Sequence, residues 1–327
     1  MKSFDAINPA IEATKQLLFP FDLTRWLKLG VVALLSGNSA GGGNFPSSGG
    51  STGNSTELPF FDFNAFIAQY GLIIGTIAFV LLIICIILTY IASVFSFVFL
   101  ENLIERKDAV ISAFGRNSGK GFSYFLFHIV LGLATIITLI LFIAPAFLFL
   151  SGGNNIGLIL AIIGLLLLWF FTFGLLFGII TGFTYGFVLP LMHLKNKGLK
   201  ESWKELKNMV FKEKKEFLMY IIMSIILGIG AGLIALVLLI PLLIIAFIIG
   251  IIALIAGAAA LFTGGFNLTI ILIIIAIAVP ALIIFSYLAA VSTLPVTVFL
   301  RYYSIIFIGK MDSETGKLLE AKGIKLN

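Results

Sequence analysis

The stretch IGLILAIIGLLLLWFFTFGLLFGIITGFTYGFVLPLMHLKNKGLKESWKELKNMVFKEKKE, residues Ile156–Glu216, joins an apolar run to the most basic segment of the chain. Its first 37 residues, Ile156–Met192, carry no charge. An α-helix needs about 20 apolar residues to cross the hydrocarbon core of a bilayer. The following segment, His193–Glu216, contains eight lysines. We interpret the whole stretch as a membrane-spanning helix that ends in a basic elbow at the membrane surface.

Glycine recurs at every fourth position in the apolar part of this stretch. An α-helix places residues four apart on one face, and glycines there let another helix approach closely. We predict a helix-packing face, with a dimer face or a groove for a lipid or solute as the alternatives. Its members are Gly174, Gly178, Gly182 and Gly186.

The composition of the whole chain is typical of a membrane protein. Of 327 residues, 60% are hydrophobic and only 11% are charged. The mean hydropathy of +1.16 is far above that of soluble domains. A single cysteine excludes a disulfide framework and cysteine-based metal clusters. We therefore predict an all-α fold, a polytopic integral membrane protein.

The placement of positive charge predicts the topology. Lysine and arginine are confined to the N-terminal segment, two elbows between apolar runs, and the C-terminal segment. The connectors between these blocks have none. Because positive charge is retained on the cytoplasmic side, about six crossings with both termini in the cytoplasm satisfy the pattern. The 46-residue run 217–262 then holds one crossing that ends near Gly250, followed by an outer-leaflet half-helix or a helix extension.

These patterns divide the chain into five parts. The N-terminal helix is amphipathic, with an apolar stripe of Phe4, Ile7, Ile11 and Leu18, and lies on the membrane surface or on the protein's own cytoplasmic face. The first transmembrane helix is short, and a re-entrant half-helix is its alternative. Both basic elbows carry apolar residues at near-helical spacing, which predicts short amphipathic helices. The parts are an interfacial helix (1–20), the short first transmembrane helix (21–37), a Gly/Ser/Asn-rich external loop (38–66), a membrane domain of five helices in repeated hairpin units (67–303), and a cytoplasmic tail (304–327).

Several stretches together resemble an uncharacterised family, a domain of unknown function, of archaeal multi-pass membrane proteins. They are Ala10–Leu29 with its LLFPFDLTRWLKL core, Phe97–Glu101, Phe187–Trp203 and Phe299–Tyr303. The elbowed helix pairs are more loosely similar to the membrane domain of glycerophosphodiester phosphodiesterases, although no catalytic domain of that enzyme is recognised. The resemblance implies an archaeal cell-membrane protein and supplies no activity.

No catalytic residue, cofactor site or metal site is predicted. The two histidines, His128 and His193, lie near the cytoplasmic ends of apolar runs, with Glu101 and Glu105 at comparable depth. Their sequence spacing does not indicate that they converge, so we interpret both as ordinary interfacial histidines. Aromatic and arginine side chains near the ends of spans are expected to act as interfacial anchors. These are Trp26, Trp203, Arg301, Tyr302 and Tyr303.

The function that these observations favour is non-enzymatic: a membrane scaffold, an assembly subunit or a lipid-interacting protein. The alternative is a transporter or permease-like protein for a small or lipid-like solute, built from repeated helix pairs with proline breaks. The expected partners are the lipid bilayer, anionic lipid headgroups at the lysine-rich elbow, and a homo-oligomer or another membrane protein. Nucleic acid is not expected, because basic residues are spread over separate segments and interleaved with acidic ones.

Overall fold

The computed structural model describes residues 2–37, 63–106, 110–147, 155–262 and 268–326. All regular structure in these ranges is helical, as predicted. The elements are α1 (Lys2–Asp5), α2 (Ile7–Leu18), α3 (Leu23–Leu35), α4 (Phe63–Glu105), α5 (Ile111–Phe147), α6 (Asn155–Trp169), η2 (Phe170–Gly174), α7 (Leu175–Phe183), η3 (Thr184–Val188), α8 (Leu189–Leu194), α9 (Leu199–Lys212), α10 (Lys214–Phe262), α11 (Leu268–Ser292), α12 (Leu294–Met311) and α13 (Ser313–Ala321). The predicted external loop 38–66 lies mostly outside the described residues.

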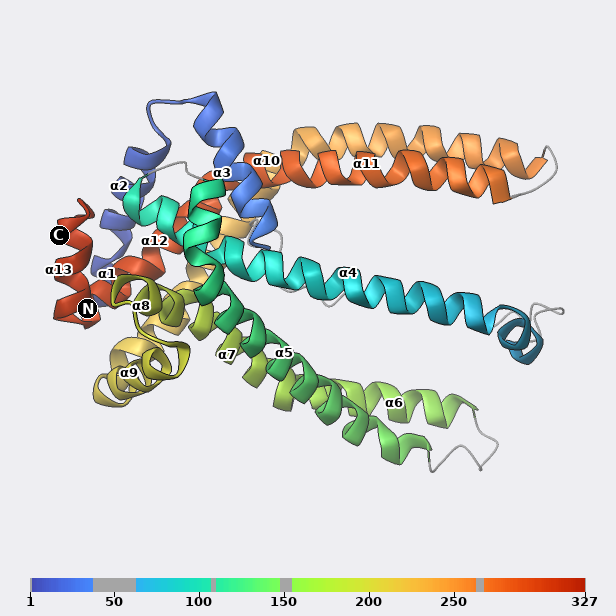
Figure 1. The fold of residues 1–327 in the computed structure, drawn as a ribbon, viewed down its shortest axis with the longest axis horizontal. Coiled ribbons are helices and arrows are strands. Elements are labelled where there is room, and N and C mark those ends of the chain that lie inside the picture. Colours follow the sequence, from blue (N-terminus) through green and yellow to red (C-terminus); the bar gives the residue numbers. More distant parts are fainter. Residues whose placement is uncertain (1, 38–62, 107–109, 148–154, 263–267, 327) are drawn as a thin grey trace.

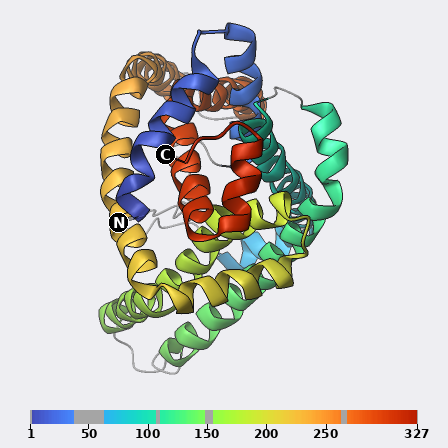
Figure 2. The ribbon, with the colours of Figure 1, turned by 90° about the vertical axis from the view of Figure 1, so that its left-hand side faces the viewer.

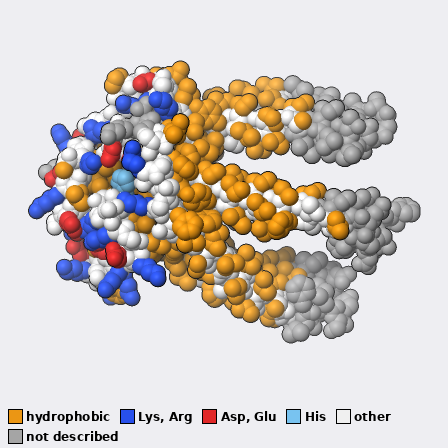
Figure 3. Space-filling model, in the orientation of Figure 1, with side chains coloured by type: hydrophobic (Ala, Val, Ile, Leu, Met, Phe, Trp, Pro, Cys, Tyr) orange, Lys and Arg blue, Asp and Glu red, His pale blue; other side chains and the backbone are white. Residues whose placement is uncertain are grey.

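Long apolar helices project as separate arms from one packed, charged end (Figure 1). One arm holds α10 and α11, the second is α4, and the third pairs α5 with α6 and α7. Charged side chains gather at the packed end, whereas the arms present hydrophobic side chains (Figure 3). We call this end the hub. It contains all of α1–α3, η3, α8, α9, α12 and α13, together with the parts of the long helices that pack on them: α4 after Val94, α5 up to Tyr124 and α10 up to Met223.

Helix α12 forms the centre of the hub. Every residue from Arg301 to Gly309 is buried. Viewed from the hub end, α12 and α13 lie in the middle, with α2, α9, α10 and α5 around them (Figure 2). The predicted cytoplasmic tail therefore begins inside the core, since residues 304–311 continue α12.

The N-terminal helix packs on the protein itself, which was one of the two alternatives. Alanines give α2 a smooth face that approaches α12 closely: Ala10 is fully buried and Ala13 almost so. The expected apolar stripe is buried only in part: Leu18 is 1% exposed and Ile7 packs against the core, whereas Phe4 and Ile11 are 47% and 38% exposed. Alanines supply part of the buried face, and the search for large apolar residues did not include them.

Five described helices are long and apolar enough to cross a membrane. Four of them agree with predicted crossings. The fifth, α12, was predicted only in part, because the apolar run 268–300 breaks at Thr293 into α11 and α12. Helix α3 has 13 residues and a length of about 20 Å, which is shorter than a hydrocarbon core. The five spans are Gly75–Glu105, Ile111–Pro145, Leu160–Leu194, Lys214–Ile251 and Leu294–Met311.

The two basic elbows differ in structure. The second contains the separate amphipathic helix α9, as predicted. The first does not: Ile111 and Phe114 belong to the first turn of the unbroken α5, so the short helix expected there was wrong. Residues 251–262 extend α10, which was one of the two predicted alternatives.

Helices α4 and α5 approach each other closely at Gly121. A Cβ atom at Gly121 would lie 2.7 Å from the Cα atom and 2.5 Å from the Cγ2 atom of Val94. No real side chain tolerates such distances, and the backbone of α4 would have to move. Gly119, one half-turn away, has no neighbour within 4 Å among the described residues.

We expect Gly121→Ala to destabilise the protein by about 1–3 kcal/mol, because it overpacks the α4–α5 contact. Gly119→Ala is the matched control and should be neutral or slightly stabilising, since alanine favours helix and meets nothing there. Thermal unfolding of the purified protein in detergent measures both. Equal unfolding temperatures for the two variants would contradict the close approach.

Candidate functional site

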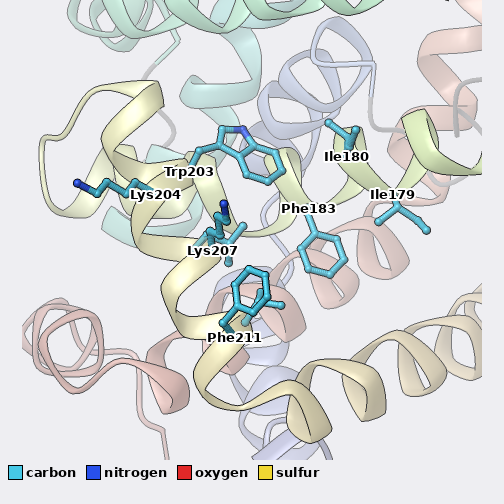
Figure 4. Close-up of a pocket in the computed structure, with 9 residues that line it drawn as sticks. Ile179, Ile180, Phe183, Trp203, Lys204, Lys207 and Phe211 are labelled. Atoms are coloured by element: carbon cyan, nitrogen blue, oxygen red, sulfur yellow. The ribbon is translucent and has the colours of Figure 1, made fainter.

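An apolar groove of about 500 Å³ runs between α7 and α9, where the third arm meets the hub (Figure 4). Ile179, Ile180 and Phe183 of α7 line one side. Trp203 and Phe211 of α9 face them from the other. The groove therefore lies at the boundary between the apolar arm and the charged hub.

Lysines form the rim of this groove. Lys204 and Lys207 line it from α9, and both are exposed. The Nζ atoms of Lys207 and Lys214 lie 5.8 Å and 5.2 Å from the centre of the Phe211 ring. These distances allow cation–π attraction, which keeps the ammonium groups over the aromatic end of the groove. An apolar floor with a cationic rim fits an amphiphile that carries a negative head.

The sequence pattern of α9 explains the arrangement. Leu206 is buried against the hub, and Trp203 and Val210 flank the groove on the same helix. Lysines occupy the positions between these residues and reach solvent. The sequence therefore predicted the presence of the amphipathic helix α9 in the second basic elbow, with Trp203 on it. The opposing wall from α7 was missed, because the sequence gives no indication of which face of the long span turns toward α9.

The predicted glycine face splits between two environments. A Cβ atom at Gly186 would lie 3.7 Å from the Cβ atom of Ser304 in α12, an ordinary packing contact. Gly174 meets only Phe170 of its own helix, and Gly178 and Gly182 meet nothing within 4 Å in the described part of the chain. Steps of four residues also turn about 40° around an α-helix, so the face spirals. A packing role for Gly178 and Gly182 stays a prediction that needs a surface beyond these residues.

Arg301 lies in the core of the hub and contacts η3. Its side chain is 2% exposed, and its guanidinium carbon lies 3.7 Å from the centre of the Tyr185 ring. Nη1 donates a hydrogen bond to the carbonyl oxygen of Tyr185. Its neighbours Tyr302 and Tyr303 are also buried. The structure places this predicted anchor trio inside the protein; its depth in a membrane stays a prediction.

Three other predicted interfacial anchors, Trp26, Tyr302 and Tyr303, contact neighbouring helices. The Tyr302 hydroxyl donates to the Leu103 carbonyl at 2.7 Å, and the Tyr303 ring stacks on Tyr220 at 5.2 Å. The Trp26 indole donates to the Leu18 carbonyl at 3.2 Å. These contacts join the N-terminal segment and α12 to neighbouring helices.

Three carboxylates converge on Lys195 just after α8. Its Nζ atom lies 2.5 Å from Glu205, 2.7 Å from Asp312 and 2.7 Å from Glu314. The three carboxylates have the mutual spacing of metal ligands. The Lys195 ammonium occupies the position of a cation among them, so the cluster serves to attach α9 and α13 to the end of α8.

This cluster shifts the pKa values of its members. Burial raises the pKa of Glu205 and of Asp312, but hydrogen bonds from the Lys195 ammonium outweigh it and lower both below their ordinary values. Burial lowers the pKa of Lys195, and its three carboxylate partners more than reverse that effect. Carboxyls with a lowered folded-state pKa stabilise the fold above their unfolded values near 4, and this stability is lost as pH falls through the folded values.

We therefore expect the unfolding temperature to fall as the pH drops below about 5, because the unfolded chain then takes up protons at Glu205 and Asp312 that the folded protein does not. Lys195→Met should lower stability at neutral pH, because it leaves the carboxylates without their cation, and should flatten this pH dependence. Lys317→Met removes an exposed lysine from α13 and is the control. A Lys195→Met variant with the original pH profile would contradict the assignment.

Comparison with known proteins identifies a family and no activity. Residues 1–318 match the model of a family of unknown function (DUF7544). No curated protein and no solved structure matches the chain. Because the family model covers nearly the whole chain, this protein belongs to the DUF7544 family, and the part of it that the structure describes is all-helical with five candidate membrane-spanning helices.

Proposed function

We propose that this protein is a non-enzymatic membrane protein that binds anionic lipids at the α7–α9 groove and thereby fixes the position of its hub at the membrane surface. The observation that carries the proposal is the pairing of an apolar groove with a lysine rim where the arm joins the hub. Lipid acyl chains match the apolar floor. A phosphate-bearing headgroup matches Lys204 and Lys207 at the rim.

The position of the groove supports this occupant. The arms carry most of the helices that are long and apolar enough to span a bilayer, whereas α12, which also meets that criterion, lies buried in the hub, where the charge gathers. The boundary between them corresponds to the depth of lipid headgroups. Trp203 at this boundary is the residue type that membrane interfaces favour. A lipid already present at that depth would reach the groove without crossing the bilayer.

The charge distribution supports one orientation. Positive residues gather at the hub, which also contains both ends of the described chain (Figure 2). Because the cytoplasmic side retains positive charge, we place the hub and both termini in the cytoplasm of a cell membrane. An archaeal source, and the looser likeness to phosphodiesterase membrane domains, rest on the sequence motifs alone.

A scaffold or assembly role is compatible with lipid binding. The arms leave apolar faces uncovered, including Gly178 and Gly182 near the groove, and a second copy or another membrane protein would find a close-packing surface there. A transporter is less well supported: the apolar runs that form the arms contain no charged residue to couple an ion gradient to a solute.

The test is lipid retention by the full chain in native mass spectrometry and its affinity for vesicles that contain phosphatidylglycerol. Replacing Lys204 and Lys207 together by glutamine should weaken binding by about 30-fold, since each basic residue near the surface contributes about 1 kcal/mol. The control replaces Lys200 and Lys212, which are exposed on the same helix but do not line the groove. Equal losses in the two double variants would show only a general charge effect and would contradict a specific groove.

A further inference from the structure

A second, polar cavity of about 310 Å³ opens on the hub, away from the groove. The C-terminal end of α4, the first turns of α5, the end of α8 and the C-terminal segment around α13 form its walls. Residues far apart in the sequence thus meet at one place. Its charged and titratable lining consists of Glu101, Glu105, Arg116, Lys120, His193 and Lys322.

Both carboxylates in this cavity already have partners. Glu101 is 5% exposed and accepts hydrogen bonds from the Arg116 guanidinium and the Asn117 amide. Glu105 accepts from the Lys322 ammonium at 3.2 Å. Each acidic group is therefore neutralised by a cation from another element, and the repulsion that it would exert on an incoming anion is reduced.

Two donors in the cavity have no such partner. Lys120 is half-buried, and no carboxylate of the described residues lies within ion-pair distance of its Nζ atom. The His193 imidazole also lines the cavity; its Nδ1 atom is fully buried, which leaves Nε2 as the ring nitrogen that a bound anion can reach. Three cations and two carboxylates line the cavity, so its net charge is +1 with a neutral histidine.

We propose that this cavity binds a phosphate group, held by the Lys120 ammonium and the His193 imidazole. Phosphate oxygens accept several hydrogen bonds from converging donors, and the outward N–H groups of Arg116, whose side chain is 54% exposed, supply further ones. The bound group connects α5 to α8 and lies beside Lys322, which follows α13. Phosphate binding thereby couples the C-terminal segment to two of the spans. The site is independent of the α7–α9 groove.

The phosphate has two sources, a soluble anion or the headgroup of a phospholipid. The test measures thermal unfolding of the full-length protein in detergent with inorganic phosphate against chloride at equal ionic strength. A second arm uses phosphatidylcholine bicelles with and without phosphatidic acid. A rise of the unfolding temperature in the first arm identifies a soluble anion, and a rise in the second arm alone identifies a headgroup.

Variants make the assignment specific. Lys120→Gln should weaken phosphate binding at least tenfold and abolish most of the shift, whereas Lys120→Arg, which keeps the charge, should retain it. His193→Gln should also weaken phosphate binding. This variant is the alternative test if Lys120→Gln does not fold. Lys204→Gln with Lys207→Gln should leave the phosphate response unchanged, which separates this site from the groove. Absence of a shift in both arms, or an equal shift in Lys120→Gln, would overturn the proposal.

Discussion

The contact between Arg301 and Tyr185 lies at the centre of the hub and joins α12 to η3. Among the described residues the buried guanidinium has no carboxylate partner, which is costly unless other groups stabilise its charge. The face of the Tyr185 ring and its carbonyl oxygen do so in part, while Nε and Nη2 of Arg301 have no hydrogen-bond partner in the described structure. Tyr185 lies in η3, a π-helical segment, and such segments disturb the regular backbone hydrogen bonding of an α-helix. The irregular segment thus presents both a ring and a carbonyl to α12, and this contact joins the central helix to the helical rod that runs from α6 to α8.

The hub and the arms differ in how much of their side-chain surface the protein itself buries. Side chains pack in the hub, whereas the arms are covered by little of the chain itself. Apolar helices that expose their side chains along most of their length need an apolar solvent, which a bilayer supplies. The hub is therefore the part that determines how the arms are arranged.

Sequence patterns predicted the long apolar helices and the basic α9 well, because hydropathy and charge act over many residues. They predicted α12 only in part, because polar residues, including Arg301 and Ser304, made its second half resemble a surface tail. The buried face of α2 was predicted only in part, because alanines form it together with Leu17 and Leu18. The convergence of Glu101, Lys120 and His193 depends on tertiary packing of three helices, which no local spacing records. The glycine pattern was visible, but its contacts depend on which faces the hub covers.

The most direct test of this account is the accessibility of the single cysteine. Cys85 is exposed on α4, in the arm that we place within the bilayer. In permeabilised native membranes, a membrane-impermeant maleimide should not label Cys85, whereas it should rapidly label a cysteine placed on the hub by Lys317→Cys in a Cys85→Ser background. Denaturation in sodium dodecyl sulfate should then make Cys85 reactive. Labelling of Cys85 in the membrane as fast as that of the hub cysteine would contradict the division into membrane arms and an aqueous hub.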